Sequence, residues 1–241
     1  MNTQLRRHLR DHATRAYLGT GLFNYRWARG KLGGDAIFPA LLEANVFRDG
    51  ARVLDLGCGR GLLAAWFLAA EQMAARGVWP AHLRQPPRDL RFRGFELMAR
   101  EAEVGNRALQ PHFPGRVELC GGDMCEAPVA GADAVAILDV LHYVDFPAQE
   151  KLLDRIRDAL PPGGVLITRV GDAAAGWRFR FSQFVDRCMA GAQGHAAPPT
   201  WCRPLAAWVA ALESRGFAVT TASMSQGTPF ANVMLVGRLP G

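Results

Sequence analysis

The chain has 241 residues, of which 49% are hydrophobic and 21% are charged, and it carries a formal net charge of +6 at pH 7. This length suits one α/β domain, and no apolar run is long enough to cross a bilayer, so we expect no membrane span. The arginines are spread along the chain, and the charge therefore favours an anionic partner without indicating nucleic acid.

The N-terminal segment lacks the apolar stretch of a secretory signal, and Asp11 breaks the acid-poor pattern of a transit peptide, so we expect a cytoplasmic protein. The cysteines form no CxxC pair, and none lies beside a histidine at zinc spacing, which predicts reduced, mostly buried thiols and no bound metal. They are Cys58, Cys120, Cys125, Cys188 and Cys202.

Two helices are predicted first, over residues 3–17 and 35–45, with an aromatic and basic segment at 22–32 between them. Strands and helices then alternate. Apolar runs predict strands at 51–56, 90–97, 116–120, 133–138, 165–170, 217–224 and 233–239. Apolar residues at helical spacing predict helices at 61–75, 101–109, 148–160 and 203–215.

Crossover helices of this length force parallel pairing, with right-handed connections. We therefore predict a doubly wound, Rossmann-like α/β fold whose seven-stranded sheet is mostly parallel, with a C-terminal antiparallel strand, N-terminal helices and a helical lid. Residues 1–50 are expected to form a helical cap, and residues 51–241 the ligand-binding domain, with the lid at about 171–203. Ligands of such sheets bind at the carboxyl ends of the strands.

The most informative motif is V-L-D-L-G-C-G-R-G at residues 53–61, a strand that runs into a glycine turn and then a helix. Gly57, Gly59 and Gly61 allow the backbone to turn tightly and approach a ligand, while the helix N-terminus presents unpaired N–H groups. The glycines could serve the turn alone, or a dinucleotide site, whose fingerprint is G-x-G-x-x-G. Asp55 argues against a dinucleotide, because a carboxylate would repel a pyrophosphate but would suit an ammonium group.

With this motif, residues 50–170 resemble the class I S-adenosylmethionine-dependent methyltransferases. The resemblance implies that Asp55 contacts the methionine amino group and that the glycine turn packs against the cofactor. It also implies that residues 51–241 form the methyltransferase domain, with S-adenosyl-L-methionine as its cofactor.

The ends of the next three strands complete the resemblance. Glu96, followed by Leu97, matches the ribose-binding acid, although its distance from Gly61 is longer than usual and requires an inserted loop. Asp123 and Met124 match the adenine-binding acid and its apolar neighbour, with a turn or cap role as the alternative for Asp123. Asp139 lies where the family places the methionine portion of the cofactor.

His142 follows on the same segment and is the candidate general base, with lining of the cofactor pocket as the alternative. An ionised acceptor would need no base. Transfer from a sulfonium is an in-line displacement, so alignment and exclusion of water are the main tasks of the enzyme.

Two segments that mix aromatic residues with arginine, at 23–31 and 177–181, are candidates for acceptor binding. The candidate substrate residues in these segments are Tyr25, Arg29, Trp177 and Arg178. Tyr143, which follows His142, is a further candidate. The alternative is that these aromatics only anchor lid helices to the sheet.

We therefore predict methyl transfer to a small organic acceptor that is anionic, aromatic or unsaturated, such as an intermediate of secondary-metabolite or quinone biosynthesis, and that a carrier protein could deliver. The alternatives are an NAD-dependent oxidoreductase and a non-catalytic cofactor-binding partner protein. A nucleic-acid methyltransferase is disfavoured, because the fourth strand lacks the Asn or Asp followed by Pro-Pro and an aromatic residue.

Overall fold

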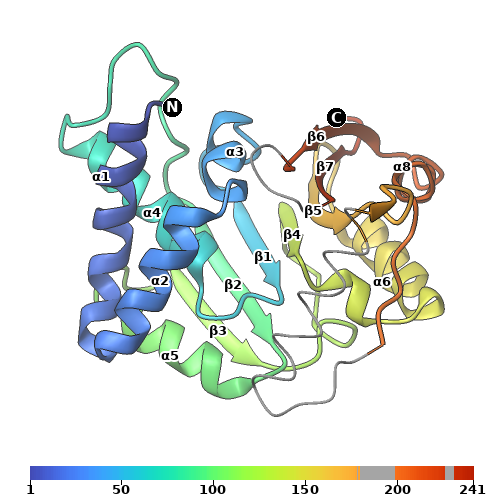
Figure 1. The fold of residues 1–241 in the computed structure, drawn as a ribbon, viewed down its shortest axis with the longest axis horizontal. Helices are drawn as coiled ribbons and strands as arrows, with labels where there is room; N and C mark the ends of the chain where they lie inside the picture. Colours follow the sequence, from blue (N-terminus) through green and yellow to red (C-terminus); the bar gives the residue numbers. More distant parts are fainter. Residues whose placement is uncertain (178, 180–198, 226–230) are drawn as a thin grey trace. The chain divides into compact units, whose positions relative to one another are not determined.

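The computed structural model describes residues 1–177, 179, 199–225 and 231–241 (Figure 1). The strands are β1 (Arg52–Leu56), β2 (Arg91–Glu96), β3 (Val117–Gly121), β4 (Ala134–Leu138), β5 (Val165–Gly171), β6 (Ala218–Ser223) and β7 (Asn232–Arg238). They form a seven-stranded sheet in the order β3-β2-β1-β4-β5-β7-β6. β7 runs antiparallel to β5 and β6, whereas β1, β2 and β3 pair in parallel. The predicted mostly parallel Rossmann-like sheet with an antiparallel C-terminal strand is confirmed.

The described helices precede, separate or follow these strands along the chain. They are α1 (Thr3–Thr14), η1 (Arg15–Thr20), α2 (Leu22–Gly34), α3 (Ile37–Glu43), α4 (Leu62–Ala75), α5 (Ala99–Leu109), η2 (Leu141–Tyr143), α6 (Phe146–Ala159) and α8 (Leu205–Glu213). No helix among the described residues is long and apolar enough to cross a membrane.

The chain divides into two compact units, Met1–Val135 and Ala136–Gly241, and the division falls within β4. The predicted cap, residues 1–50, lies in the first unit. The predicted lid at 171–203 lies in the second unit and is largely outside the described residues, as are residues 226–230 between β6 and β7.

The core of the first unit forms where α4 packs on the sheet. Phe67 of α4 lies edge-on to Phe47, with ring centroids 4.8 Å apart, and its centroid is 6.5 Å from that of Phe92 on β2. Most of α4 is buried, because it is apolar on nearly every side and α1 packs on it as well. This helix therefore joins the N-terminal helices to the sheet.

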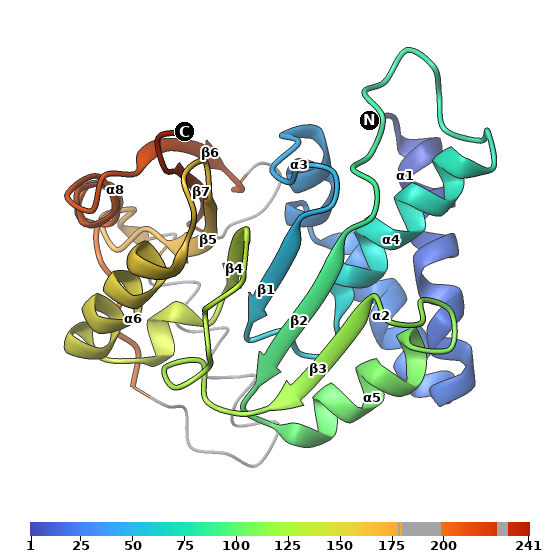
Figure 2. The ribbon, with the colours of Figure 1, turned by 180° about the vertical axis from the view of Figure 1, so that it is seen from behind.

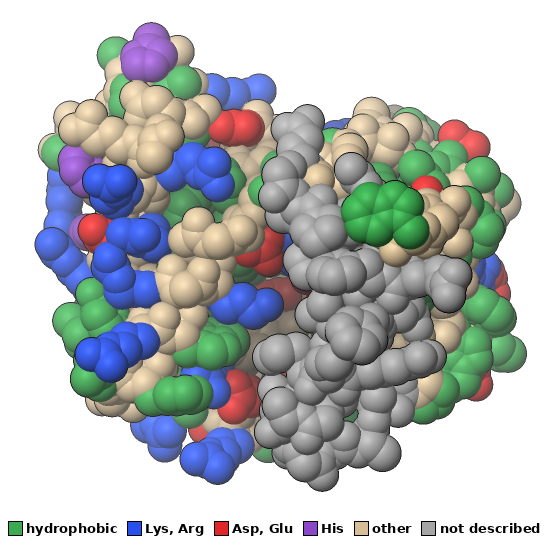
Figure 3. All heavy atoms as spheres, viewed as in Figure 1, with side chains coloured by type: hydrophobic (Ala, Val, Ile, Leu, Met, Phe, Trp, Pro, Cys, Tyr) green, Lys and Arg blue, Asp and Glu red, His purple; other side chains and the backbone are tan. Residues whose placement is uncertain are grey.

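The N-terminal region differs from the prediction. α1 begins where the Asn2 side chain accepts a hydrogen bond from the Leu5 amide, at 2.9 Å, but it ends at Thr14 and continues as the tighter η1. Residues 22–32, predicted as a joining segment, lie within α2. This helix has no clear apolar stripe, so periodicity could not reveal it, and contacts with α1 and η1 stabilise it instead. Figure 3 shows Lys and Arg side chains spread over the outer surface of α1 and α2.

The other predicted elements are present, with ends that differ by a few residues. α6, for example, begins at Phe146 and not at 148, because the Asp145 side chain accepts a hydrogen bond from the Ala148 amide at 2.8 Å and caps the helix. The cysteines are less buried than predicted. Cys58 is buried, whereas Cys120, Cys125 and Cys202 are half-buried, and Cys188 lies outside the described residues.

The second unit is built on β5, β7 and β6. α8 packs on β6 and β7, and its Trp208 is fully buried. Thr168 on β5 donates a hydrogen bond from its hydroxyl to the carbonyl oxygen of Ile137, at 2.9 Å. This bond satisfies a buried hydroxyl next to β4.

Candidate functional site

The glycine turn after β1 is held against the end of β2. The Gly57 and Cys58 amides both donate to the carbonyl oxygen of Phe95, at 2.8 and 3.2 Å. Gly57, Gly59 and Gly61 all have positive φ, of 79°, 53° and 75°. Residues with a Cβ rarely adopt this backbone conformation, so the turn that precedes α4 depends on glycine.

Gly61 has much less room around it than Gly59, which has open space at the position of a Cβ atom. A Cβ atom at Gly61 would lie 2.9 Å from the Cδ1 atoms of Leu109 and Leu119, in addition to the strain of its positive φ. We expect Gly61→Ala to lower the free energy of unfolding by about 3 kcal/mol. Urea denaturation would measure the change. Gly30→Ala is the control, because Gly30 lies in α2 with open space around it, and this variant should be stabilised by about 0.5 kcal/mol. Equal stability of the two variants would contradict the packing argument.

Asp55 lies on β1 just before this turn and is only 5% exposed. Burial, and then the negative charge of Glu96, raises the pKa of its carboxyl group to about 7. No cation in the described part of the chain contributes to this shift. A buried carboxyl group next to a second carboxylate is an unfavourable arrangement that a bound ammonium group would relieve.

Glu96 ends β2 and is bonded to the glycine turn. Its Oε2 accepts a hydrogen bond from the Gly59 amide at 3.0 Å, and its Oε1 accepts one from the Met98 amide at 3.1 Å. A carboxylate has further lone pairs on both oxygens, so hydroxyl groups of a ligand can still donate to it. The next residue, Leu97, is 77% exposed. The glycine turn, Asp55 and Glu96 therefore meet at the carboxyl ends of β1 and β2, as predicted for a doubly wound sheet.

Asp123 follows β3 and shapes a turn. Its Oδ1 accepts a hydrogen bond from the Cys125 amide at 2.8 Å, the local role that the sequence left open as an alternative. The side chain is exposed, and Met124 beside it is half-buried. The second carboxylate oxygen of Asp123 keeps acceptor capacity for a ligand amino group.

Arg60, which the sequence analysis did not single out, is the most connected side chain of the turn. Its guanidinium forms an ion pair with Glu101 at the start of α5, with Nε 2.5 Å from Oε2. It also donates from Nη1 to Asn24 at 2.8 Å and lies 4.4 Å from the ring centroid of Trp27, both in α2. The backbone carbonyl of Arg60 accepts a 2.7 Å hydrogen bond from the buried Tyr17 hydroxyl. One residue of the glycine turn thus holds η1, α2 and α5.

The candidate substrate residues of α2 contact each other. Arg29 donates a 3.2 Å hydrogen bond to the Tyr25 hydroxyl and lies over its ring, with Cζ 5.5 Å from the centroid. Arg29 also pairs with Asp11 of α1, at 2.8 Å. These contacts join α1 to α2, and the side chains of Tyr25 and Arg29 remain half-buried.

The remaining candidates lie in the second unit. Asp139 has a positive φ of 62° and pairs with the buried Arg169 of β5, whose Nε lies 2.6 Å from its Oδ1. His142 lies in η2 with its ring centroid 4.1 Å from that of Tyr143, which is 41% exposed. Trp177 is 65% exposed, and Arg178 is outside the described residues. The Arg169 partner of Asp139 had no signal in the sequence, because a strand pattern does not tell which side chains pair across it.

Comparison with known proteins identifies the family of the chain. A family model described as a methyltransferase domain matches residues 29–222. The chain is 32% identical over 93 residues to the tetracenomycin polyketide synthesis 8-O-methyl transferase TcmO of Streptomyces glaucescens, over 39% of this chain and 27% of that protein. It is 40% identical over 73 residues to the N,N-dimethyltransferase OxyT of Streptomyces rimosus, over 30% of this chain and 21% of that protein. The chain thus spans only about a quarter of the length of these curated relatives.

One solved structure shares its fold with nearly the whole of this chain. The magnesium protoporphyrin IX methyltransferase of Synechocystis, with bound SAH, superposes with a TM-score of 0.58 at 16% identity, covering 98% of this chain and 99% of that chain. The family model matches well over half of the chain and includes the glycine turn, Glu96 and Asp123. The chain therefore belongs to the class I S-adenosylmethionine-dependent methyltransferases.

Proposed function

We propose that the protein transfers a methyl group from S-adenosylmethionine to a small organic acceptor. The observation that carries this proposal is the buried carboxyl group of Asp55, next to a glycine turn and with no cation nearby in the described residues. The amino group of the methionine portion is the cation that this position fits. A dinucleotide would bring a pyrophosphate to it, and the NAD-dependent alternative is disfavoured on the same electrostatic ground.

The residues of the first unit have distinct roles in this proposal. Asp55 pairs with the methionine ammonium group, while Gly57, Gly59 and Gly61 let the cofactor approach the backbone. Glu96 accepts hydrogen bonds from the ribose hydroxyls, and its bonds to Gly59 and Met98 hold it in place for this task. The remaining proposed cofactor contacts are Leu97, Asp123 and Met124 of the same unit and Asp139 of the second unit. The bound cofactor supplies a methyl group activated on a sulfonium sulfur.

The acceptor is proposed to be anionic, aromatic or unsaturated, as in secondary-metabolite or quinone biosynthesis. The relative TcmO is a methyl transferase of tetracenomycin polyketide synthesis, which supports this class of acceptor. Tyr25, Arg29, Tyr143 and Trp177 are the described candidates for acceptor contacts, with residues 1–50 as a cap and 171–203 as a lid. Delivery by a carrier protein, and a cytoplasmic location, are part of the same proposal.

His142 is proposed as the general base that accepts the acceptor's proton. An unperturbed histidine titrates near neutral pH, which suits this task. For an acceptor that is already ionised, His142 would only line the pocket. His142→Ala therefore distinguishes the two cases, because it should slow methylation of a neutral phenol and spare that of a carboxylate.

Glu96→Ala provides a direct check of the ribose contact. We expect SAH affinity to fall about tenfold or more, since hydrogen bonds to a charged group are among the stronger ones. Titration calorimetry would measure it. Glu103→Ala is the matched control, because Glu103 is an exposed carboxylate on α5. The SAH affinity of this variant should equal that of the wild type. Unchanged affinity in Glu96→Ala would remove Glu96 from the site.

The activity itself is tested by incubating the protein with methyl-labelled S-adenosylmethionine and a panel of hydroxylated aromatic acids, with a metabolite extract as a second acceptor source. Label in a low-mass product supports the proposal. Tight SAH binding with no labelled product from either source would instead favour the non-catalytic partner protein. Quenching of the protein's fluorescence by NADH, without any binding of SAH, would favour the NAD-dependent oxidoreductase.

A further inference from the structure

One face of the sheet in the first unit carries no crossover helix. The connections from β1 to β2 and from β2 to β3 run in the same direction across the sheet, so right-handed crossovers place α4 and α5 on one face. The return from β3 to β4 should cover the opposite face, but residues 122–133 contain no helix. Figure 2 shows this face of β1, β2 and β3 with no helix of the first unit over it. Parallel sheets are normally covered on both faces, so the exposure is unusual.

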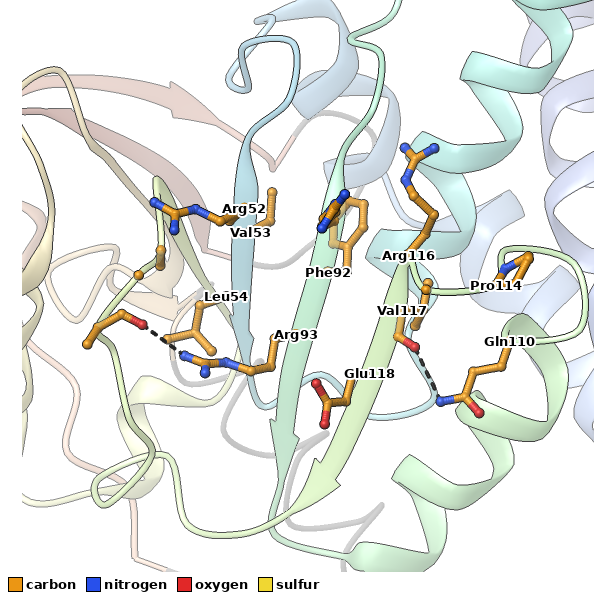
Figure 4. A pocket seen from close by; sticks show the side chains of 15 residues that line it. Arg52, Val53, Leu54, Phe92, Arg93, Gln110, Pro114, Arg116, Val117 and Glu118 are labelled. Atoms are coloured by element: carbon orange, nitrogen blue, oxygen red, sulfur yellow. Dashed lines mark hydrogen bonds between the residues drawn. The ribbon is translucent and has the colours of Figure 1, made fainter.

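A groove of about 830 Å³ lies along this face (Figure 4). It extends from the turn at 114–115 across the first halves of β3, β2 and β1 to the loop at 130–132. Arg93 crosses it and donates hydrogen bonds to the carbonyl oxygens of Pro128 and Ala130, at 2.6 and 3.3 Å. These bonds hold the loop that forms one wall of the groove.

Arginines outnumber carboxylates around the groove. Arg91 and Arg93 have no acidic partner among the described residues, and Arg91 is exposed. At the β1 side, Arg48 and Arg52 both pair with Asp133, at 2.8 and 3.0 Å, so this cluster keeps an excess positive charge. The arginine side chains there are 70% and 59% exposed.

Two carboxylates limit this charge. Arg116 is neutralised by Glu71, at 2.8 Å, and Glu118 is exposed on the floor of the groove opposite Arg93 in the strand register. The groove is therefore positive with one negative position within it. This pattern disfavours a nucleic-acid backbone, which would meet Glu118 with its phosphates. The groove also lacks an exposed aromatic ring for base stacking, because Phe92 is buried.

We propose that this arginine groove, defined by Arg52, Arg91, Arg93 and Glu118, docks an acidic helix of a partner protein. Guanidinium groups pair with carboxylates in a bidentate way, and Pro114, an exposed apolar residue of the lining, can contact the apolar side of such a helix. Glu118 sets the orientation, because it requires a neutral or basic residue at one position of the helix. The inference does not rest on methyl transfer, since none of these residues belongs to the cofactor site.

The test uses the full chain and a fluorescein-labelled amphipathic peptide that is helical and has glutamates along one face. Arg91→Glu should weaken its binding at least about tenfold in fluorescence anisotropy, and the wild-type affinity should fall with added salt. Arg91→Glu/Arg93→Glu should abolish binding. The matched control is Arg107→Glu, which makes the same change of charge on the exposed surface of α5 and should bind like the wild type.

Three outcomes would overturn the proposal. The first is equal peptide affinity in Arg91→Glu and Arg107→Glu, which would mean that only net charge matters. The second is failure of the wild type to bind the peptide, and the third is binding of a single-stranded oligonucleotide in preference to the peptide. SAH affinity should be unchanged in Arg91→Glu, so a failure here is distinguishable from a failure of the proposed methyl transfer.

Discussion

Replacing Asp55 with asparagine is expected to weaken SAH binding about 30-fold at pH 8, because the variant loses a charge-assisted contact with the amino group of the ligand. Asparagine has nearly the same shape, so the glycine turn should remain intact. Titration calorimetry of the wild type and Asp55→Asn would measure the difference. Equal affinity would exclude Asp55 from the proposed ammonium contact.

The pH dependence of the same two proteins sharpens this test. In the absence of ligand, burial and the charge of Glu96 raise the pKa of Asp55 to about 7. A bound ammonium group favours the ionised carboxylate, so wild-type affinity should rise as the pH increases through 7 and fall by up to about tenfold per pH unit below it. Asp55→Asn should show no such change between pH 6 and pH 7.5. A flat wild-type profile would contradict a cation at this position.

As the pH rises, the stability of the unliganded protein should fall, whereas its affinity for SAH should rise. A carboxyl group whose pKa is raised by folding contributes stability that is fully present below its unfolded pKa, near 4, and is lost as the pH rises through about 7. Above pH 7, Asp55→Asn should therefore be more stable to urea than the wild type, although it binds SAH more weakly. This combination separates loss of a binding contact from general damage to the fold.

Replacing Arg60 with alanine is expected to lower the free energy of unfolding by about 3 kcal/mol, because it leaves Glu101 without its partner in a site where both side chains are mostly buried. It also removes the contacts with Asn24 and Trp27, so α2 should separate from the glycine turn. Urea denaturation would measure the stability, and hydrogen exchange of the α2 amides would measure the local opening.

The control for Arg60 is Arg29→Ala. Arg29 also forms an ion pair in this region, but Arg29 and Asp11 have side chains that are 30% and 40% exposed, so the loss should be under about 1 kcal/mol. Arg60→Lys keeps the charge without the planar fork, and it should recover only part of the stability. If Arg60→Ala and Arg29→Ala lower the free energy of unfolding by the same amount, Arg60 does not organise the turn.

Several features of the site could be predicted from local sequence. The glycines of residues 57–61 indicate a backbone conformation that other residues rarely adopt, and the apolar run before them indicates a buried strand. Glu96 could be found despite the long insertion before it, because it lies at the end of the second predicted strand, 90–97, and is the last residue of β2. The α2 helix could not be found, since its residues show no periodic apolar face.

The amino-acid sequence by itself determined the order of strands and helices, the glycine turn and the acidic residues at the ends of β1 and β2, because each depends on residues close together in the chain. Only the tertiary structure decided that Arg60 joins η1, α2 and α5 and that Arg169 pairs with Asp139. It also decided that arginines line a groove on the face of β1–β3 that carries no helix of the first unit. These features depend on side chains that are far apart in the chain and on which strands lie side by side, and periodicity and propensity carry no information about either.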